Sequence, residues 1–277
     1  VADRILGMER TVFYGGVVVM AGHIALAVLP GLPGVGFGLV LVALGSGALK
    51  ANASSLLGTL YDKGDPRADG GFTLFYLGVN LGAFVGPLAT GLLQTRIGFH
   101  YGFGAAAIGM ALGLIQYVMF RRNLGSYGRI VANPLPPQAI GKVIAVVATL
   151  AAAVTVLFLV HVVDLANLSQ FTTAVIVVAS VMYFAVMLTS AKVSGTEKIR
   201  VRAFIPLFVA NAVFWSLFQQ TFTVLAVYSD ERVNWSLFGW TAPSNWIGSI
   251  EPVWIILLSP LFAILWTRLG NRAPTTP

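Results

Sequence analysis

The sequence contains no cysteine, and only 10% of its 277 residues are charged. The first absence excludes disulfide bonds and thiolate metal sites. The second excludes an ordinary soluble domain, in which about 25% of residues are charged. With 57% hydrophobic residues, the composition instead predicts an integral membrane protein.

The net charge of +7 does not indicate a nucleic-acid partner, because the basic residues stand in short segments between apolar runs rather than on one polar face. The sequence also has no phosphate-binding loop, no cluster of metal ligands and no nucleophile beside a base. We therefore expect neither an enzyme nor a protein with a metal or cofactor.

The first ten residues, VADRILGMER, have neither the apolar core nor the small-residue cleavage site of a signal peptide. They look like a loop from the middle of a protein. We therefore expect this chain to be an internal fragment of a longer one.

Eight apolar segments have the length of about 20 residues that a helix needs to cross a bilayer. The predicted fold class is accordingly an all-α integral membrane protein with eight transmembrane helices. The segments are 11–30, 36–58, 71–94, 99–120, 140–161, 169–191, 203–228 and 246–267.

Basic residues fall in alternate loops, as the positive-inside rule predicts for loops on the cytoplasmic side. The intervening loops contain only Arg96 and Arg232. Both ends of the chain are therefore expected to be cytoplasmic, in a multi-pass protein of the cell membrane. The residues of the basic loops are Arg4, Arg10, Lys63, Arg67, Arg121, Arg122, Arg129, Lys142, Lys192, Lys198, Arg200, Arg202, Arg268 and Arg272.

Lys50 is the one basic residue deep inside a span, about 18 Å along the helix direction from Asp62. A lysine at mid-span costs about 2.5 to 3.5 kcal/mol and normally faces a bundle interior or a watery cavity. Ser46, Lys50 and Ser54 follow one another at four-residue spacing and form one polar stripe. The alternative is a lysine that extends to the interface and has no functional role.

Glu251 is the other charge within a span, and it lies near the outer end of the eighth. Pro252 follows it and favours an extended residue at 251, which would leave the helix end open. The sequence leaves two interpretations: a functional carboxylate, or an interfacial one stabilised by the helix dipole.

The seventh span carries a polar line at four-residue spacing, formed by Asn211, Trp215, Gln219 and Thr223. Such a line either contacts a solute or bonds helix to helix. Asn80, in the third span, has the same two interpretations, and His23 is a candidate proton relay.

The segment FTLFYLGVNLGAF, residues 72–84, resembles the second signature of the proton-dependent oligopeptide transporter family, a branch of the major facilitator superfamily. Flanking segments agree: LGSGALKANASSLLGTLYDKGDPRADGGF is similar to the family's lysine-bearing helix and acidic loop. FWSLFQQ and SIEPVWIILLSPLFAILWTRLG look like helices seven and eight.

This resemblance implies a partial major facilitator fold. The spans would be family helices three to six, an extra helical hairpin, and helices seven and eight. The first two and last four helices, and the Glu-x-x-Glu-Arg motif of the first, are absent, so the missing helices of the same protein are implied partners. The implied domains are the rest of the N-terminal half (1–121), a cytoplasmic linker (122–138), a peripheral transmembrane hairpin (139–192) and two helices of the C-terminal half (203–268).

The resemblance also implies roles for residues. Lys50 matches the lysine of proton coupling and peptide carboxylate binding, Asn80 an asparagine that contacts the peptide backbone, and Trp215 an aromatic wall. Gln219 stands where the family usually has glutamate, and Glu251 where it usually has asparagine. Our hypothesis is that the carboxylate has moved from span seven to span eight, where it receives the peptide ammonium or takes part in proton coupling.

The implied function is proton-coupled symport of di- and tripeptides by alternating access, with the peptide, protons and the lipid bilayer as partners. Two alternatives stay open at the level of sequence. One is a facilitator for another small solute, which Gln219 favours; the other is a truncated membrane protein that transports nothing.

Overall fold

The structure is a computed structural model, and it describes residues 1–62, 64–65, 67–124, 127–131, 133–162, 164, 166–237 and 239–269. Lys63 and Arg272, two of the basic residues used for orientation, lie outside these ranges.

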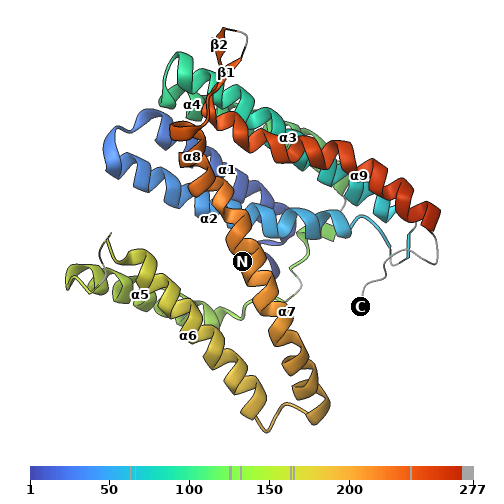
Figure 1. The fold of residues 1–277 in the computed structure, drawn as a ribbon. Helices are drawn as coiled ribbons and strands as arrows, with labels where there is room; N and C mark the ends of the chain where they lie inside the picture. Colours follow the sequence, from blue (N-terminus) through green and yellow to red (C-terminus); the bar gives the residue numbers. More distant parts are fainter. Residues whose placement is uncertain are drawn as a thin grey trace. The chain divides into compact units, whose positions relative to one another are not determined.

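Nine α-helices and one short hairpin make up the described chain (Figure 1). Eight helical stretches are long and apolar enough to cross a membrane, which confirms the eight predicted spans and the all-α class. The α-helices are α1 (Met8–Val28), α2 (Gly31–Gly58), α3 (Ala68–Arg96), α4 (Phe99–Phe120), α5 (Pro137–Leu159), α6 (Leu168–Thr189), α7 (Gly195–Gln219), α8 (Val224–Arg232) and α9 (Ile250–Leu269). The shorter elements are η1 (Ala2–Leu6), η2 (Arg121–Leu124), η3 (Tyr127–Arg129), η4 (Gln220–Phe222), β1 (Ser236–Leu237), β2 (Trp240–Thr241) and η5 (Ser244–Ser249).

The chain divides into two compact units. The first contains residues 1–134 and 221–277, and the second contains residues 135–220. These units do not follow the expected division into helical halves, linker and hairpin, and that division stays a prediction.

Helices α1 and α2 of the first unit approach each other through facing glycines. A Cβ built on Gly45 would lie 2.6 Å from the carbonyl oxygen of Gly15 and 2.6 Å from the amide of Val19. A Cβ on Gly22 would lie 2.8 Å from the carbonyl oxygen of Gly38. Small side chains therefore allow the backbones to touch, as the glycine content of these spans predicts.

Gly45→Ala is expected to destabilise the protein by about 1 to 3 kcal/mol, because the added methyl group forces α1 and α2 apart. Gly47 provides the matched control, since nothing lies within 4 Å of a Cβ at that position. Gly47→Ala should be neutral or stabilise by up to about 1 kcal/mol through helix propensity. Thermal unfolding in detergent, followed by intrinsic fluorescence, measures both; equal midpoints for the two variants would contradict the packing.

The sequence predicts one continuous helix for the seventh span, but the structure shows a break in it. Helix α7 ends at Gln219, a 3₁₀ turn follows over Gln220–Phe222, and Thr223 has φ −125° and ψ −88° before α8 begins. The expected polar line therefore ends at Gln219, and Thr223 does not continue it. This expectation was wrong because residue spacing assumes unbroken helical geometry.

The link after α4 packs against the start of α1. Glu9 is 3% exposed, and the Nε of Arg129 lies 2.5 Å from its carboxylate. The hydroxyl of Tyr117 donates to the carbonyl of Glu9 over 3.1 Å. Asn133 donates its backbone N–H to Asp3 over 2.9 Å. The sequence does not indicate this ion pair, in which only the carboxylate is buried, because its members are 120 residues apart.

In the second unit, α6 and α7 contact each other through aromatic rings. The ring of Phe184 lies 5.2 Å from that of Phe208 in a T-shaped arrangement, which is a favourable geometry. Helix α7 begins with a capping box, in which Ser194 and Glu197 satisfy each other's backbone amides.

Candidate functional site

Lys50 lies on α2 with an exposed side chain. Within the described parts of the chain, no ion pair or hydrogen bond engages its ammonium. Ser46 lies one turn earlier, and its hydroxyl bonds to its own helix through the carbonyl of Ala43, at 3.4 Å. The ammonium is thus available to a ligand or to another group.

Asn80 lies on α3 and is buried, with 6% of its surface exposed. Its side-chain amide donates to the carbonyl of Tyr76 over 2.8 Å. A peptide contact by Asn80 therefore requires this bond to be exchanged or supplemented, and that role stays a prediction.

Lys50 and Asn80 stand at equal distances along their helices from the contact between α2 and α3. Helices α2 and α3 are joined by a short loop, and the position of a Cβ on Gly58 is 3.6 Å from the ring of Phe72. Lys50 is eight residues before Gly58, and Asn80 is eight residues after Phe72. Both residues are therefore about 12 Å from the contact between the helices.

Helices α3 and α9 lie side by side and antiparallel (Figure 1), and polar contacts show how they are aligned. The indole of Trp246 donates to the carbonyl of Leu88 over 3.4 Å, and the hydroxyl of Ser249 donates to that of Phe84 over 2.9 Å. Residues later in the segment of η5 and α9 therefore lie beside residues earlier in α3.

This alignment places Glu251 near the middle of α3. Glu251 follows Ser249 by two residues, so it lies about 3 Å beyond the level of Phe84, while Asn80 lies about 6 Å beyond it. The level of Glu251 is about 21 Å from each end of α3. Glu251 lies in the first turn of α9, which agrees with its predicted place near one end of the span, and the assignment of that end to the outer side stays a prediction.

The residue before Pro252 is helical rather than extended. Ile250 has φ −68° and ψ −46°, and α9 begins there, so Glu251 and Pro252 both lie in its first turn. Proline is tolerated in this turn because the first amides of a helix have no acceptor within the helix. The predicted open helix end is therefore absent here.

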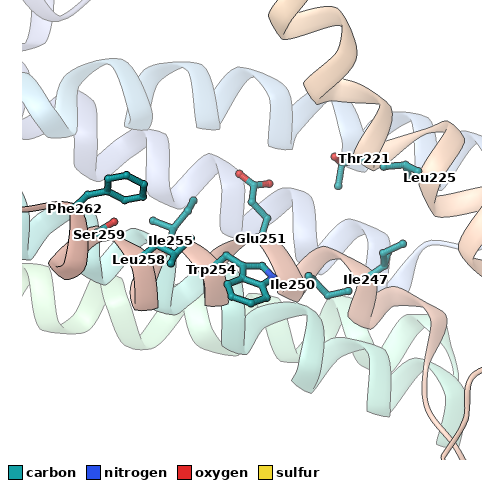
Figure 2. A pocket seen from close by; sticks show the side chains of 10 residues that line it. All are labelled: Thr221, Leu225, Ile247, Ile250, Glu251, Trp254, Ile255, Leu258, Ser259 and Phe262. Carbon is teal, nitrogen blue, oxygen red and sulfur yellow. The ribbon is translucent and has the colours of Figure 1, made fainter. Parts of the chain in front are cut away.

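Glu251 points into a cavity of about 600 Å³ in the first unit (Figure 2). Thr221 and Leu225 line one side, and Ile250, Trp254 and Leu258 line the α9 side. Glu251 is half-buried, and in the described chain no ion pair or hydrogen bond engages its carboxylate. A mostly apolar cavity of this size with one carboxylate fits a small molecule that bears a positive charge.

Trp215 and Gln219 belong to the second unit, at the end of α7. The side chains of both are exposed, and the ring of Trp215 lies 5.3 Å from that of Phe218. Their membership of one pocket with the other three residues stays a prediction.

His23 lines a further cavity of about 400 Å³ in the first unit, with Thr90, Gln94 and Asn245. Its Nδ1 is buried and has no hydrogen-bond partner within the described structure. Gln94 and Asn245 are hydrogen-bonded side chain to side chain. The sequence does not indicate this pair, because its members are 151 residues apart. Over the described ranges, no group of three or more His, Cys, Asp or Glu could hold a metal ion.

Eight helical stretches of membrane-crossing length in the described chain define a polytopic α-helical membrane protein, and Lys50 and Glu251 are two opposite charges without an ion-pair partner in its first unit. Its family follows from comparison with known proteins. The chain belongs to the POT family. The family model that shows this is described as "PTR2: POT family", and it matches residues 9–277.

Several relatives are similar over the whole chain. The uncharacterized transporter YclF of Bacillus subtilis (strain 168) is 43% identical over 100% of this chain and 56% of its own length. The di-/tripeptide transporter of Lactococcus lactis subsp. cremoris is 37% identical over 100% of this chain and 58% of its own. A crystal structure of the peptide transporter POT in complex with sulfate superposes with a TM-score of 0.91, at 42% identity, over 99% of this chain and 57% of that one.

These comparisons confirm the predicted family and the partial major facilitator superfamily fold. The chain spans 56% of the length of YclF and 58% of the length of the Lactococcus lactis transporter, which is a little over half of each.

Proposed function

We propose that this chain forms part of a proton-coupled symporter that carries di- and tripeptides across the cell membrane by alternating access. The observation that supports it most directly is the pair of opposite charges, Lys50 on α2 and Glu251 on α9 of the first unit, which have no ion-pair partner in the described chain. A peptide carries the two complementary charges at its ends.

In this proposal the peptide carboxylate binds the ammonium of Lys50, and the peptide ammonium binds the carboxylate of Glu251. Charge-assisted hydrogen bonds of this kind are about twice as strong as neutral ones. The apolar wall formed by Ile250, Trp254 and Leu258 receives a side chain of the peptide. Asn80 contacts the peptide backbone, and Trp215 and Gln219 complete the wall.

Proton coupling follows from the cost of isolated charges. An ammonium and a carboxylate do not both stay ionised and unpaired at low dielectric, because each loses its hydration. Arrival of a peptide or a proton therefore changes the counter-ion of Lys50 or Glu251. Exchange of counter-ions allows the two halves of a major facilitator fold to separate on one side of the membrane and close on the other.

The proposal includes the domains, the partners and the orientation of the chain. Residues 1–121 belong to the N-terminal half and 203–268 to the C-terminal half, with 122–138 as cytoplasmic linker and 139–192 as peripheral hairpin. Further helices of the same protein close the pathway, and the surrounding partner is the lipid bilayer. Both ends of this chain face the cytoplasm.

The test uses the chain with all flanking sequence that its gene encodes, reconstituted into liposomes. We expect labelled dialanine to accumulate when the outside is acidic, and a protonophore to abolish accumulation. Unlabelled di- and tripeptides should compete, whereas free amino acids, nitrate and sugars should not. Competition by nitrate or amides would support the facilitator instead, and uptake of none of these solutes would support a protein that transports nothing.

A further inference from the structure

A second hollow, of about 720 Å³, opens where α3 and α8 end. Its wall comes from Thr95 and Arg96 of α3, from Asp230 of α8 and from residues 233–235 and 240–244. The distribution of basic residues places this end of α3 on the outer side of the membrane. The hollow shares no residue with the Glu251 cavity.

Opposite charges line the hollow without pairing with each other. The side chains of Arg96 and Asp230 are both exposed, and no ion pair joins them in the described part of the chain. The guanidinium provides five N–H donors, and the carboxylate provides two acceptor oxygens. One hollow thus offers an anion-binding group and a cation-binding group.

The carboxylate of Asp230 is held in place by a hydrogen-bonded floor. The hydroxyl of Ser244 donates to it over 2.7 Å. The hydroxyl of Ser229, which is fully buried, donates to the carbonyl of Ser244 over 3.0 Å, and the indole of Trp235 donates to the carbonyl of Ser229 over 2.8 Å. The Ser244 hydroxyl therefore orients the carboxylate, and Ser229 and Trp235 hold the backbone around it through bonds to the carbonyls of Ser244 and Ser229.

Two indoles form an aromatic wall. Trp235 and Trp240 both line the hollow and are half-buried. The β1–β2 pairing places Thr241 opposite Ser236, and the ring of Trp240 lies 5.2 Å from that of Trp246. Trp246 in turn bonds to α3 through the carbonyl of Leu88. The wall is thereby tied to the same helix that carries Arg96.

We infer that this hollow is a second, outer binding site for a small zwitterionic peptide with an apolar or aromatic side chain. The peptide carboxylate binds Arg96, the peptide ammonium binds Asp230, and the side chain packs on Trp240 and Trp235. A hollow that carries both signs of charge beside low-dielectric walls raises the local concentration of such a ligand. The inference rests on the proposed function, because it makes this site the point of capture before transport.

The test compares neighbouring charges on the same face. Arg96→Gln and Asp230→Asn should each raise the KM for alanyl-phenylalanine about threefold without changing the maximal rate, since both charges are exposed. The controls Arg232→Gln and Glu231→Gln remove charges that are next to Asp230 in sequence but do not line the hollow. The controls should leave KM unchanged, and about 0.5 M salt should abolish the difference between variants and controls. An unchanged KM in both variants, or an equal rise in the controls, would overturn the site.

A binding measurement separates failure of this site from failure of the proposed function. In protein carrying Lys50→Ala, calorimetry should show residual binding of alanyl-phenylalanine that weakens about threefold with Arg96→Gln, and no binding of its uncharged N-acetyl amide. If the unaltered protein takes up no peptide but this binding persists, the transport function is wrong and the outer site stands. Residual binding that does not depend on Arg96 or Asp230 would overturn the site, whatever the transport result.

Discussion

Lys50→Ala is expected to reduce proton-driven uptake of dialanine by at least about 100-fold, which corresponds to about 2.7 kcal/mol. Removal of one member of a ligand-bound charge pair costs about 2 to 5 kcal/mol, because the other charge is left without its counter-ion. Lys50 has no other partner in the described structure, so no neighbouring group replaces its ammonium for the peptide carboxylate.

The measurement is the initial rate of labelled dialanine uptake into liposomes with an imposed pH gradient. Lys142→Ala is the matched control, since Lys142 is exposed in the first turns of α5, away from mid-span. The control should retain uptake. Concentrative uptake at an unaltered rate in Lys50→Ala would show that its ammonium has no part in coupling and would favour a lysine that only extends to the interface.

An exchange of side chains between α7 and α9 should restore a function that single substitutions remove. Glu251→Asn should lower uptake by about 100-fold, because the peptide ammonium loses its carboxylate. Gln219→Glu alone should lower uptake less, because it adds a second carboxylate to the proposed peptide site. Combined in one protein, the two substitutions should bring uptake back to within about tenfold of the unaltered rate, since the proposed site again has one carboxylate.

The control for this exchange is Glu231→Gln, which removes an exposed carboxylate outside the Glu251 cavity. It should leave uptake unchanged. A double variant no better than the worse single variant means that Glu251 has not taken over the acidic role from position 219. Full activity of Glu251→Asn alone would contradict any role for this carboxylate.

Length and composition along the chain were sufficient to predict the eight spans. A helix must bury its backbone polar groups in lipid, so each crossing needs its own apolar run, and that run is visible in the sequence without knowledge of any contact. The glycines of α1 and α2 indicated close helix packing, because backbones approach closely in lipid only where the side chains are small. Gly45 does lie against the backbone of Gly15. Segment 72–84 was enough to predict the family, which is confirmed.

The alignment of Glu251 with α3 and the break after Gln219 became visible only in the tertiary structure. Hydropathy reports where a segment is apolar, but the turn of a neighbouring helix that the segment meets depends on packing, and Ser249 meets Phe84 in the middle of α3. Likewise, Glu9 and Arg129 are brought together only by the return of the link to α1. Local sequence thus determined the number and type of the helices, whereas contacts between distant residues determined which charges share a level and which meet a partner.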